Sequence, residues 1–153
     1  MRLIPSKLGS LPRWLAQISF TLLLLTLAVK AQQMTTNNVD RDAIRAVIQR
    51  QLQAFQKDDA EEAFTFASPE IRAKFGTAKN FFQAVKTSYA AVYRPRSVMF
   101  EKLVMVQGIP TQEVVLLAPD GDLVKALYLM EKQPDGTWKI SGCFIVPMQG
   151  QTI

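Results

Sequence analysis

The side chains in this sequence that could do chemistry are a carboxylate, the tyrosines and two arginines, most of them in or beside the stretch Tyr89–Phe100 (YAAVYRPRSVMF). A carboxylate with a raised pKa in an apolar cavity can act as a general acid or base, and a nearby hydroxyl can donate to a developing oxyanion. Glu101 could take the first role and Tyr89, Tyr93 or Tyr128 the second. The favoured alternative is that Glu101 faces solvent beside Lys102 and that the tyrosines belong to the core. We therefore assign no catalytic residue.

The two arginines, Arg94 and Arg96, flank Pro95 and offer a different function. Two guanidinium groups at the mouth of an apolar pocket could hold the carboxylate of a small amphipathic acid or of a peptide segment. The alternative is that one arginine pairs with a surface acid and the other is solvated. The residues to examine first for ligand binding are therefore Tyr89, Tyr93, Arg94, Arg96 and Tyr128.

Other chemistries lack their residues. The chain has no histidine, so serine and cysteine nucleophiles have no imidazole base, and zinc or other transition-metal sites are disfavoured. Cys143 is the single cysteine, which excludes an intramolecular disulfide and is best interpreted as a small buried residue. The acidic cluster at residues 58–62 suits a helix N-terminus better than a metal site. We expect no metal and no cofactor.

The positive charge of the chain is unevenly distributed. The formal net charge is +5, from 18 basic and 13 acidic residues, but four of the basic residues and none of the acidic ones lie in residues 1–31. The remainder carries 14 basic against 13 acidic residues and is nearly neutral. A basic surface for phosphates is missing, so nucleic acid is not an expected partner.

Residues 1–31 have the features of an export signal. A positively charged start leads into Trp14–Val29, which carries no formal charge, and Ala31 provides the small residue of a cleavage site. As a helix, residues 14–29 would rise about 24 Å, short of the roughly 30 Å hydrocarbon core, which favours cleavage over a permanent span.

Two alternatives to cleavage remain open. Flanking basic residues, Arg13 and Lys30, could snorkel and keep the segment as an uncleaved membrane anchor, and a true start at Met34 would leave the protein in the cytoplasm. The preferred expectation is a protein on the extracytoplasmic, periplasmic side, with membrane contact only through residues 14–29 if they are uncleaved. Residues 32–38 are a linker and residues 148–153 a C-terminal tail.

Residues 39–147 predict one α+β domain whose helices precede its strands. A first helix with Asp40 as N-cap carries its apolar residues on one face. Asp59 starts a short second helix, Ser68-Pro69 a third that Gly76 ends, and Thr77 a fourth. The apolar face of the first helix comprises Ile44, Val47, Ile48, Leu52 and Phe55.

The second half of the domain predicts four antiparallel strands in a meander. They run from Ser97 to Val106, Gln112 to Ala118, Leu123 to Lys132 and Trp138 to Val146, and two Pro-Asp-Gly turns precede the last two. The second and third strands are apolar on both faces, whereas a sheet with one face in water should alternate. We therefore expect helices on one face and, on the other, a second copy of the chain or, less favoured, a membrane surface.

Four segments resemble an uncharacterised bacterial family, a domain of unknown function often preceded by an export signal. They are Ile48–Phe64 (IQRQLQAFQKDDAEEAF), Phe64–Phe75 (FTFASPEIRAKF), Tyr89–Phe100, and Leu127–Pro147 (LYLMEKQPDGTWKISGCFIVP). The resemblance covers about Val39–Pro147 and implies a cone similar to the nuclear-transport-factor-two-like fold, with helices packed on a curved sheet. It implies no reaction and no catalytic residue.

Three functions follow as expectations. The first is an exported, non-catalytic module that binds a small ligand or a protein. The second is an isomerase or dehydratase that uses a pocket carboxylate, and relatives within the wider cone fold make this an analogy only. The third is a membrane-tethered module that dimerises through its sheet. A cavity between helices and sheet, with its lining residues, would discriminate among them.

Overall fold

The computed structural model describes residue 38 and residues 40–148. The expected export segment, most of the linker and the end of the tail lie outside the described residues. Among the described residues, no helix is long and apolar enough to cross a membrane.

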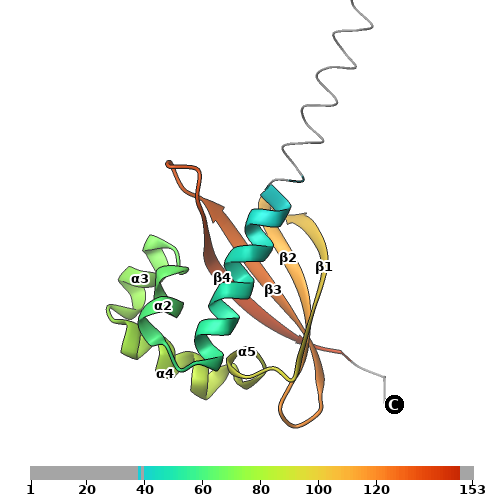
Figure 1. Ribbon diagram of the computed structural model, residues 1–153. Coiled ribbons are helices and arrows are strands. Elements are labelled where there is room, and N and C mark those ends of the chain that lie inside the picture. The colour runs from blue at the N-terminus through green and yellow to red at the C-terminus, as the bar shows by residue number, and fades with distance from the viewer. Residues whose placement is uncertain (1–37, 39, 149–153) are drawn as a thin grey trace, which may run out of the picture. The chain divides into compact units, whose positions relative to one another are not determined.

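The first described helix spans residues 40–56 and lies across one face of the sheet (Figure 1). Its predicted apolar face is confirmed, because Ile44, Ile48, Leu52 and Phe55 are almost completely buried and Val47 is half-buried against them. Asp40 is not the N-cap that the sequence predicts, since residue 38 is already helical. From sequence alone, an acidic residue that caps a helix cannot be distinguished from one inside the helix that pairs with a distant residue. The partners of Asp40 lie on the sheet.

Asp40 joins the start of this helix to the hairpin formed by residues 123–147. Its carboxylate accepts a hydrogen bond from Lys132 Nζ at 2.8 Å and one from Trp138 Nε1 at 3.2 Å. The hydrogen bond from Lys132 holds the pKa of Asp40 below its ordinary value. The helix is therefore held at this end by charge and along its length by burial.

Four shorter helices follow, and the predicted caps start three of them. Asp59, Ser68 and Thr77 each accept a hydrogen bond from the backbone N–H three residues later. Each bond satisfies one N–H group that the helix itself leaves unpaired. A last single-turn helix was not predicted. The elements are α2 (Ala60–Thr65), α3 (Pro69–Phe75), α4 (Ala78–Ser88) and α5 (Ala90–Tyr93).

The sheet is the predicted antiparallel meander, with strand order β1-β2-β3-β4. The first and third strands have the predicted bounds. The second begins at Ile109, earlier than expected, because the turn is confined to Gln107 and Gly108, both with positive φ. The strands are β1 (Ser97–Val106), β2 (Ile109–Leu117), β3 (Leu123–Lys132) and β4 (Trp138–Pro147).

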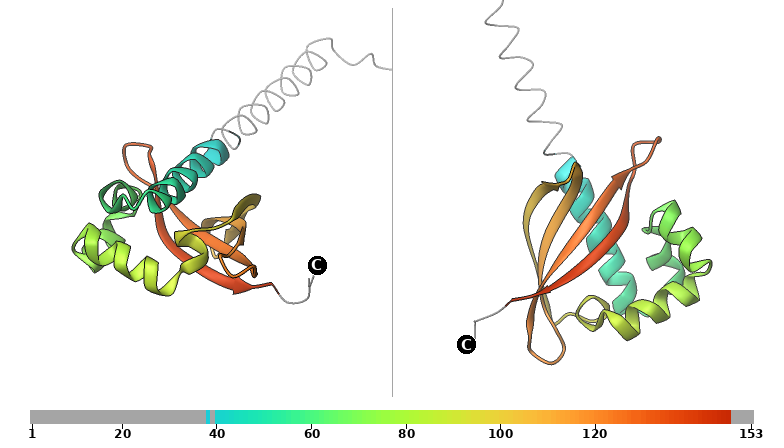
Figure 2. Two further views of the ribbon diagram at one scale, coloured as in Figure 1. Left: turned by 60° about the horizontal axis from the view of Figure 1, so that its bottom comes forward. Right: turned by 180° about the vertical axis from the view of Figure 1, so that it is seen from behind.

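The sheet has an inner face under helix 40–56 and an open outer face. Cross-strand partners Phe100, Val114, Ala126 and Ile145 form one inner row. Figure 2 shows the sheet twisting around helix 40–56, while α2, α3 and α4 lie beyond its β4 edge. The fold is thus the predicted α+β arrangement, and its helical layer extends past one edge of the sheet.

Candidate functional site

A cavity of about 270 Å³ lies between helices α3 and α4 and residues 140–144 of β4, and we call it the α4–β4 cavity. Its walls are mainly apolar and aromatic. Phe81 of α4 is central to them, with its ring centroid 5.4 Å from that of Phe75 and 6.0 Å from that of Phe55. An apolar cavity of about 150 Å³ already admits benzene in other proteins, so this one has room for a larger group.

The hydroxyl of Tyr128 is the most informative polar group at the cavity. Tyr128 lines the cavity from β3, only 1% of its surface is exposed, and within the described residues its hydroxyl has no hydrogen-bond partner. Buried polar atoms are nearly always paired, so such an atom requires an explanation. Burial raises the pKa of Tyr128 well above its ordinary value, and the group is therefore a neutral donor and acceptor.

Cys143 faces Tyr128 from the adjacent strand and also lines the cavity. The thiol contacts the Tyr128 hydroxyl and adds to the upward shift of the tyrosine pKa. A thiol is only a weak donor and a weak acceptor, so it does not satisfy this hydroxyl as a full hydrogen-bond partner would. Burial raises the pKa of Cys143 to about 12, which leaves the thiol neutral at any physiological pH. A neutral thiol is a poor nucleophile. The sequence predicts a small buried residue, and Cys143 is half-buried in the structure.

Three further polar side chains line the cavity and were not singled out from the sequence. Gln51 is buried and donates to the Ala63 carbonyl oxygen at 3.2 Å. Ser141 donates to the Leu129 carbonyl oxygen, also at 3.2 Å, and Lys74 brings an exposed ammonium group. A signal for Gln51 was present, because it lies on the apolar face of its helix between Ile48 and Phe55. For Lys74 and Ser141 the sequence contains no such signal.

The structure brings two of the predicted ligand-binding residues to the cavity and places the others elsewhere. Tyr89 and Tyr128 line it, whereas Tyr93, Arg94 and Arg96 do not. The first tyrosine lies between α4 and α5, where the change of helix direction turns it toward the cavity.

Tyr93 and Arg94 belong to a surface cluster around Asp58. The Tyr93 hydroxyl donates to one Asp58 carboxylate oxygen, and Arg94 Nη2 lies 2.7 Å from the other. The hydrogen bond from Tyr93 holds the pKa of Asp58 below its ordinary value. Arg96 has an exposed side chain. This is the arrangement of the alternative interpretation, in which one arginine pairs with a surface acid.

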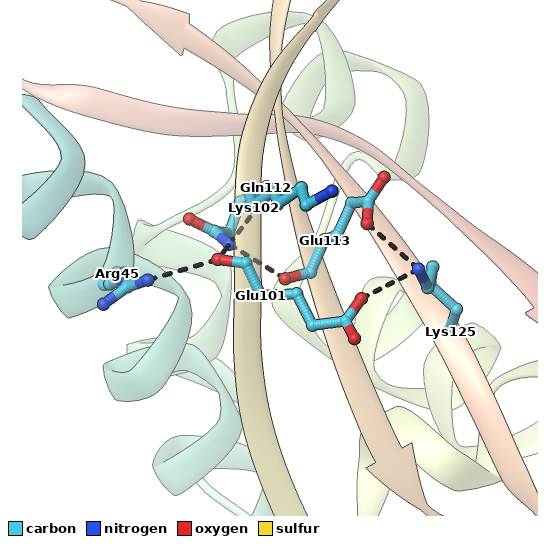
Figure 3. A network of polar contacts seen from close by, with 6 residues as sticks. All are labelled: Arg45, Glu101, Lys102, Gln112, Glu113 and Lys125. Atoms are coloured by element: carbon cyan, nitrogen blue, oxygen red, sulfur yellow. Dashed lines mark hydrogen bonds and ion pairs between the residues drawn. The ribbon is translucent and has the colours of Figure 1, made fainter.

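Glu101 lies in a bulge of β1 on the outer side of the sheet (Figure 3). Its carboxylate is 2.8 Å from Lys125 Nζ, which also lies 3.0 Å from Glu113. The hydrogen bond from Lys125 lowers the pKa of Glu101, opposite to the shift that a general acid needs. Among the described residues, the lining of the α4–β4 cavity includes no aspartate or glutamate.

The backbone of the same bulge is held from the inner side. The Glu101 carbonyl oxygen accepts from Arg45 Nη2 and from Gln112 Nε2, both at 3.2 Å (Figure 3). Arg45 Nε and Gln112 Oε1 are buried without a hydrogen-bond partner in the described part of the chain. The contacts fix the bulge and with it the outward direction of Glu101.

The described residues contain no group of three or more side chains arranged to hold a metal ion. At the cavity the described residues bring together an apolar enclosure, the buried Tyr128 hydroxyl and Lys74.

Comparison with known proteins gives a family and no function. No curated protein and no solved structure matches the chain. A family model described as a domain of unknown function, DUF4864, matches residues 37–153, which include every helix and strand described above. The chain therefore belongs to the DUF4864 family.

Proposed function

We propose that this domain is a non-catalytic binding module whose α4–β4 cavity receives the apolar part of an amphipathic ligand. The observation that carries the proposal is the Tyr128 hydroxyl, which is buried at an apolar cavity and, among the described residues, meets no polar partner stronger than the Cys143 thiol. A buried hydroxyl without a hydrogen bond costs about 1–3 kcal/mol. A ligand with an oxygen or nitrogen at this position would remove that cost.

The position of Lys74 favours a ligand that has an acidic or otherwise electron-rich group at one end. Lys74 lines the cavity from α3 and its side chain is exposed, so its ammonium group can meet an anion without being desolvated itself. The ligand that fits these features has an apolar body for the phenylalanine wall, a polar atom for Tyr128 and an anionic group for Lys74.

Straight-chain carboxylates from hexanoate to dodecanoate are suitable probes of this cavity. Isothermal titration should show that affinity rises with chain length and then stops rising when the cavity is full. Ala84→Phe adds a ring inside the cavity and should abolish binding, while Ala73→Phe, on the exposed side of α3, should leave it unchanged.

A second pair of variants tests how much the charge of Lys74 contributes to binding. Lys74→Gln should weaken binding several-fold, and Lys79→Gln, an exposed lysine of α4 away from the cavity, should not. If the carboxylates bind equally well to the Ala84→Phe variant, the cavity is not the binding site and the proposal is wrong.

We also propose that the module works on the extracytoplasmic side. The support is the composition of residues 1–31, with its basic start, uncharged Trp14–Val29 stretch and Ala31. Mass spectrometry of the protein from fractionated cells checks this. An N-terminus at Gln32 in the periplasmic fraction supports a cleaved signal, and recovery of the chain in the cytoplasm contradicts export.

A second candidate function, dimerisation, is favoured by the outer face of the sheet. Met99 and Val146 lie in one outer row with Val115 and Lys125, and they are 57% and 43% exposed. Four strands of about 33 Å, spaced by about 4.8 Å, give roughly 600 Å² on each copy, which reaches the lower end of stable interfaces. We propose a second copy of this chain as the occupant.

Equilibrium sedimentation tests the dimer with the pair Met99→Lys and Lys102→Met. The first change replaces an exposed apolar side chain of that row by a charged one and should shift the protein to monomer. Lys102 is exposed and outside that row, so the second change serves as the control. A wild-type protein that stays monomeric at high micromolar concentration contradicts this proposal, and association that requires lipid vesicles would assign the face to a membrane instead.

A further inference from the structure

The open edge of β4 already pairs with another segment at one point. Ile140 N donates to the Phe66 carbonyl oxygen and Ser68 N donates to the Ile140 carbonyl oxygen, both at 2.9 Å, in a parallel bridge between Ala67 and Ile140. Pro69 then starts α3 and the segment leaves the sheet. The chain thus begins a fifth strand beside β4 and abandons it after one bridge.

The register of the hairpin shows which groups of β4 face this edge further along. Both backbone groups of Ile140 point away from β3, so its pair with Met130 is not hydrogen-bonded. In an antiparallel ladder such pairs alternate with hydrogen-bonded ones. The next pairs of this kind are Tyr128 with Cys143, past the bulge at Leu129, and Ala126 with Ile145. The N–H and C=O groups of Cys143 and Ile145 are therefore directed to the open edge.

The two edges of the sheet differ in their protection. At the other edge, β1 carries a bulge with Glu101 and Lys102, and charges and bulges of this kind prevent another strand from pairing. Beyond its own bulge, β4 continues as Cys143–Val146 without a charge, and its only proline, Pro147, is the last residue of the strand. An edge without protection is a template for strand addition.

The α4–β4 cavity lies directly beside this edge. Residues 141–144 of β4 form one wall, and Lys74 and Phe75 of α3 with Phe81 of α4 contribute to the opposite one. A strand added to β4 would continue the plane of the sheet, and every second side chain of it would point toward the inner face. Those side chains would enter the cavity next to Cys143 and Tyr128.

We propose that the ligand of this module is an extended peptide segment of another protein, which adds to the edge of β4. The peptide backbone pairs with Cys143 and Ile145, one apolar side chain fills the α4–β4 cavity, and a carboxylate of the peptide meets Lys74. Main-chain hydrogen bonds supply affinity in this mode and the pocket supplies specificity. This inference rests on the proposed function and names the class of ligand.

The test starts by selecting peptides from a displayed library of random heptapeptides. The target is the protein expressed from Met1 and purified in the form that the cell produces. Enriched peptides should share an apolar residue and an acidic group. Their affinity should fall at least tenfold on Ala84→Phe and stay unchanged on Ala73→Phe, as for the carboxylate probes. A library that yields no such peptide overturns the inference.

N-methylation of the selected peptide separates strand addition from side-chain binding. Alternate amides of an added strand face β4. Methyl groups on these amides should abolish binding, and methyl groups on the amides between them should be tolerated. Equal loss from both sets of methyl groups overturns the inference. The variant protein is not needed for this comparison, so misfolding cannot imitate the result.

Hydrogen exchange locates the pairing on the protein. In the free protein the amides of Cys143 and Ile145 should exchange fast, while that of Phe144, between them, is protected by its partner strand. The selected peptide should slow Cys143 and Ile145 at least tenfold, and unchanged exchange there overturns the inference. If carboxylates bind the cavity but no peptide does, only this inference fails; if neither binds, the proposed function fails with it.

Discussion

Replacing Tyr128 by phenylalanine tests the central observation with the smallest possible change. The substitution Tyr128→Phe removes one oxygen and keeps the ring, which is 1% exposed. Because the hydroxyl has no partner among the described residues, its removal ends a desolvation cost of about 1–3 kcal/mol. The free energy of unfolding of the ligand-free protein should therefore rise by about 1 kcal/mol, and Tm should rise by about 4 °C.

Binding should change in the opposite direction. A ligand atom that pairs with the hydroxyl contributes about 1 kcal/mol net, so the variant should bind about fivefold more weakly. A tyrosine kept only for packing would give no loss of affinity, and a tyrosine with a satisfied hydroxyl would give a loss of stability. The combination of higher stability and weaker binding is specific to a hydroxyl that is unpaired in the free protein and pairs with the bound ligand.

Urea unfolding of the ligand-free protein and titration with octanoate or a selected peptide measure the two effects. Tyr89→Phe is the matched control, since Tyr89 also lines the cavity but is only half-buried and has no such cost to relieve. If Tyr128→Phe lowers the free energy of unfolding by about 1 kcal/mol or more, the hydroxyl is satisfied, for instance by water in the cavity. A ligand would then not be needed to pair with this hydroxyl, and the proposed role of Tyr128 would be wrong.

Three other outcomes follow from the described contacts. Because burial raises the pKa of Cys143 to about 12, iodoacetamide should alkylate the native protein at pH 8 about a thousandfold more slowly than it alkylates the urea-unfolded chain, and equal rates would contradict a buried thiol. Asp40→Asn should lower the free energy of unfolding by about 0.5 kcal/mol at pH 7, after allowance for the partial exposure of Lys132. The pKa of Asp40 is depressed in the folded state, so this difference should be present above about pH 4 and disappear as pH falls through the folded value, as urea titrations at several pH values would show. Arg94→Ala and Arg96→Ala should leave octanoate affinity within twofold, because neither residue lines the cavity, and a larger loss would restore the anion-clamp hypothesis.

The sequence predicted most of the fold because local chemistry determines it. The caps at Ser68 and Thr77 and the glycines of the Pro-Asp-Gly turns act on residues within three positions, and the apolar face of helix 40–56 repeats at the helical period. Where a distant partner decides, the prediction was wrong: Asp40 has the type and place of an N-cap but pairs with Lys132.

The site was predicted less well, because a cavity is a property of packing across the fold. A phenylalanine that fills the core and one that lines a void have the same spacing, so Phe75 and Phe81 could not be distinguished from core residues. The alternation of apolar and polar residues also could not determine which side of the sheet Glu101 faces. Two residues of β1, Glu101 and Lys102, lie in the bulge between the paired residues Phe100 and Leu103, and a bulge changes which side the following residues face.

The stretch from Tyr89 to Phe100 shows how the fold separates residues that the sequence places together. α4 ends at Ser88, and α5 restarts at Ala90 in a different direction, so Tyr89 and Val92 line the cavity while Tyr93 and Arg94 close the surface against Asp58. Arg96 then begins the sheet, donating its backbone N–H to the Leu117 carbonyl oxygen at 2.7 Å. One segment thus contributes to the cavity, to the surface and to the sheet. Its concentration of polar and aromatic residues reflects three structural positions, and only Tyr89 among its predicted ligand-binding residues is placed to meet a ligand in the cavity.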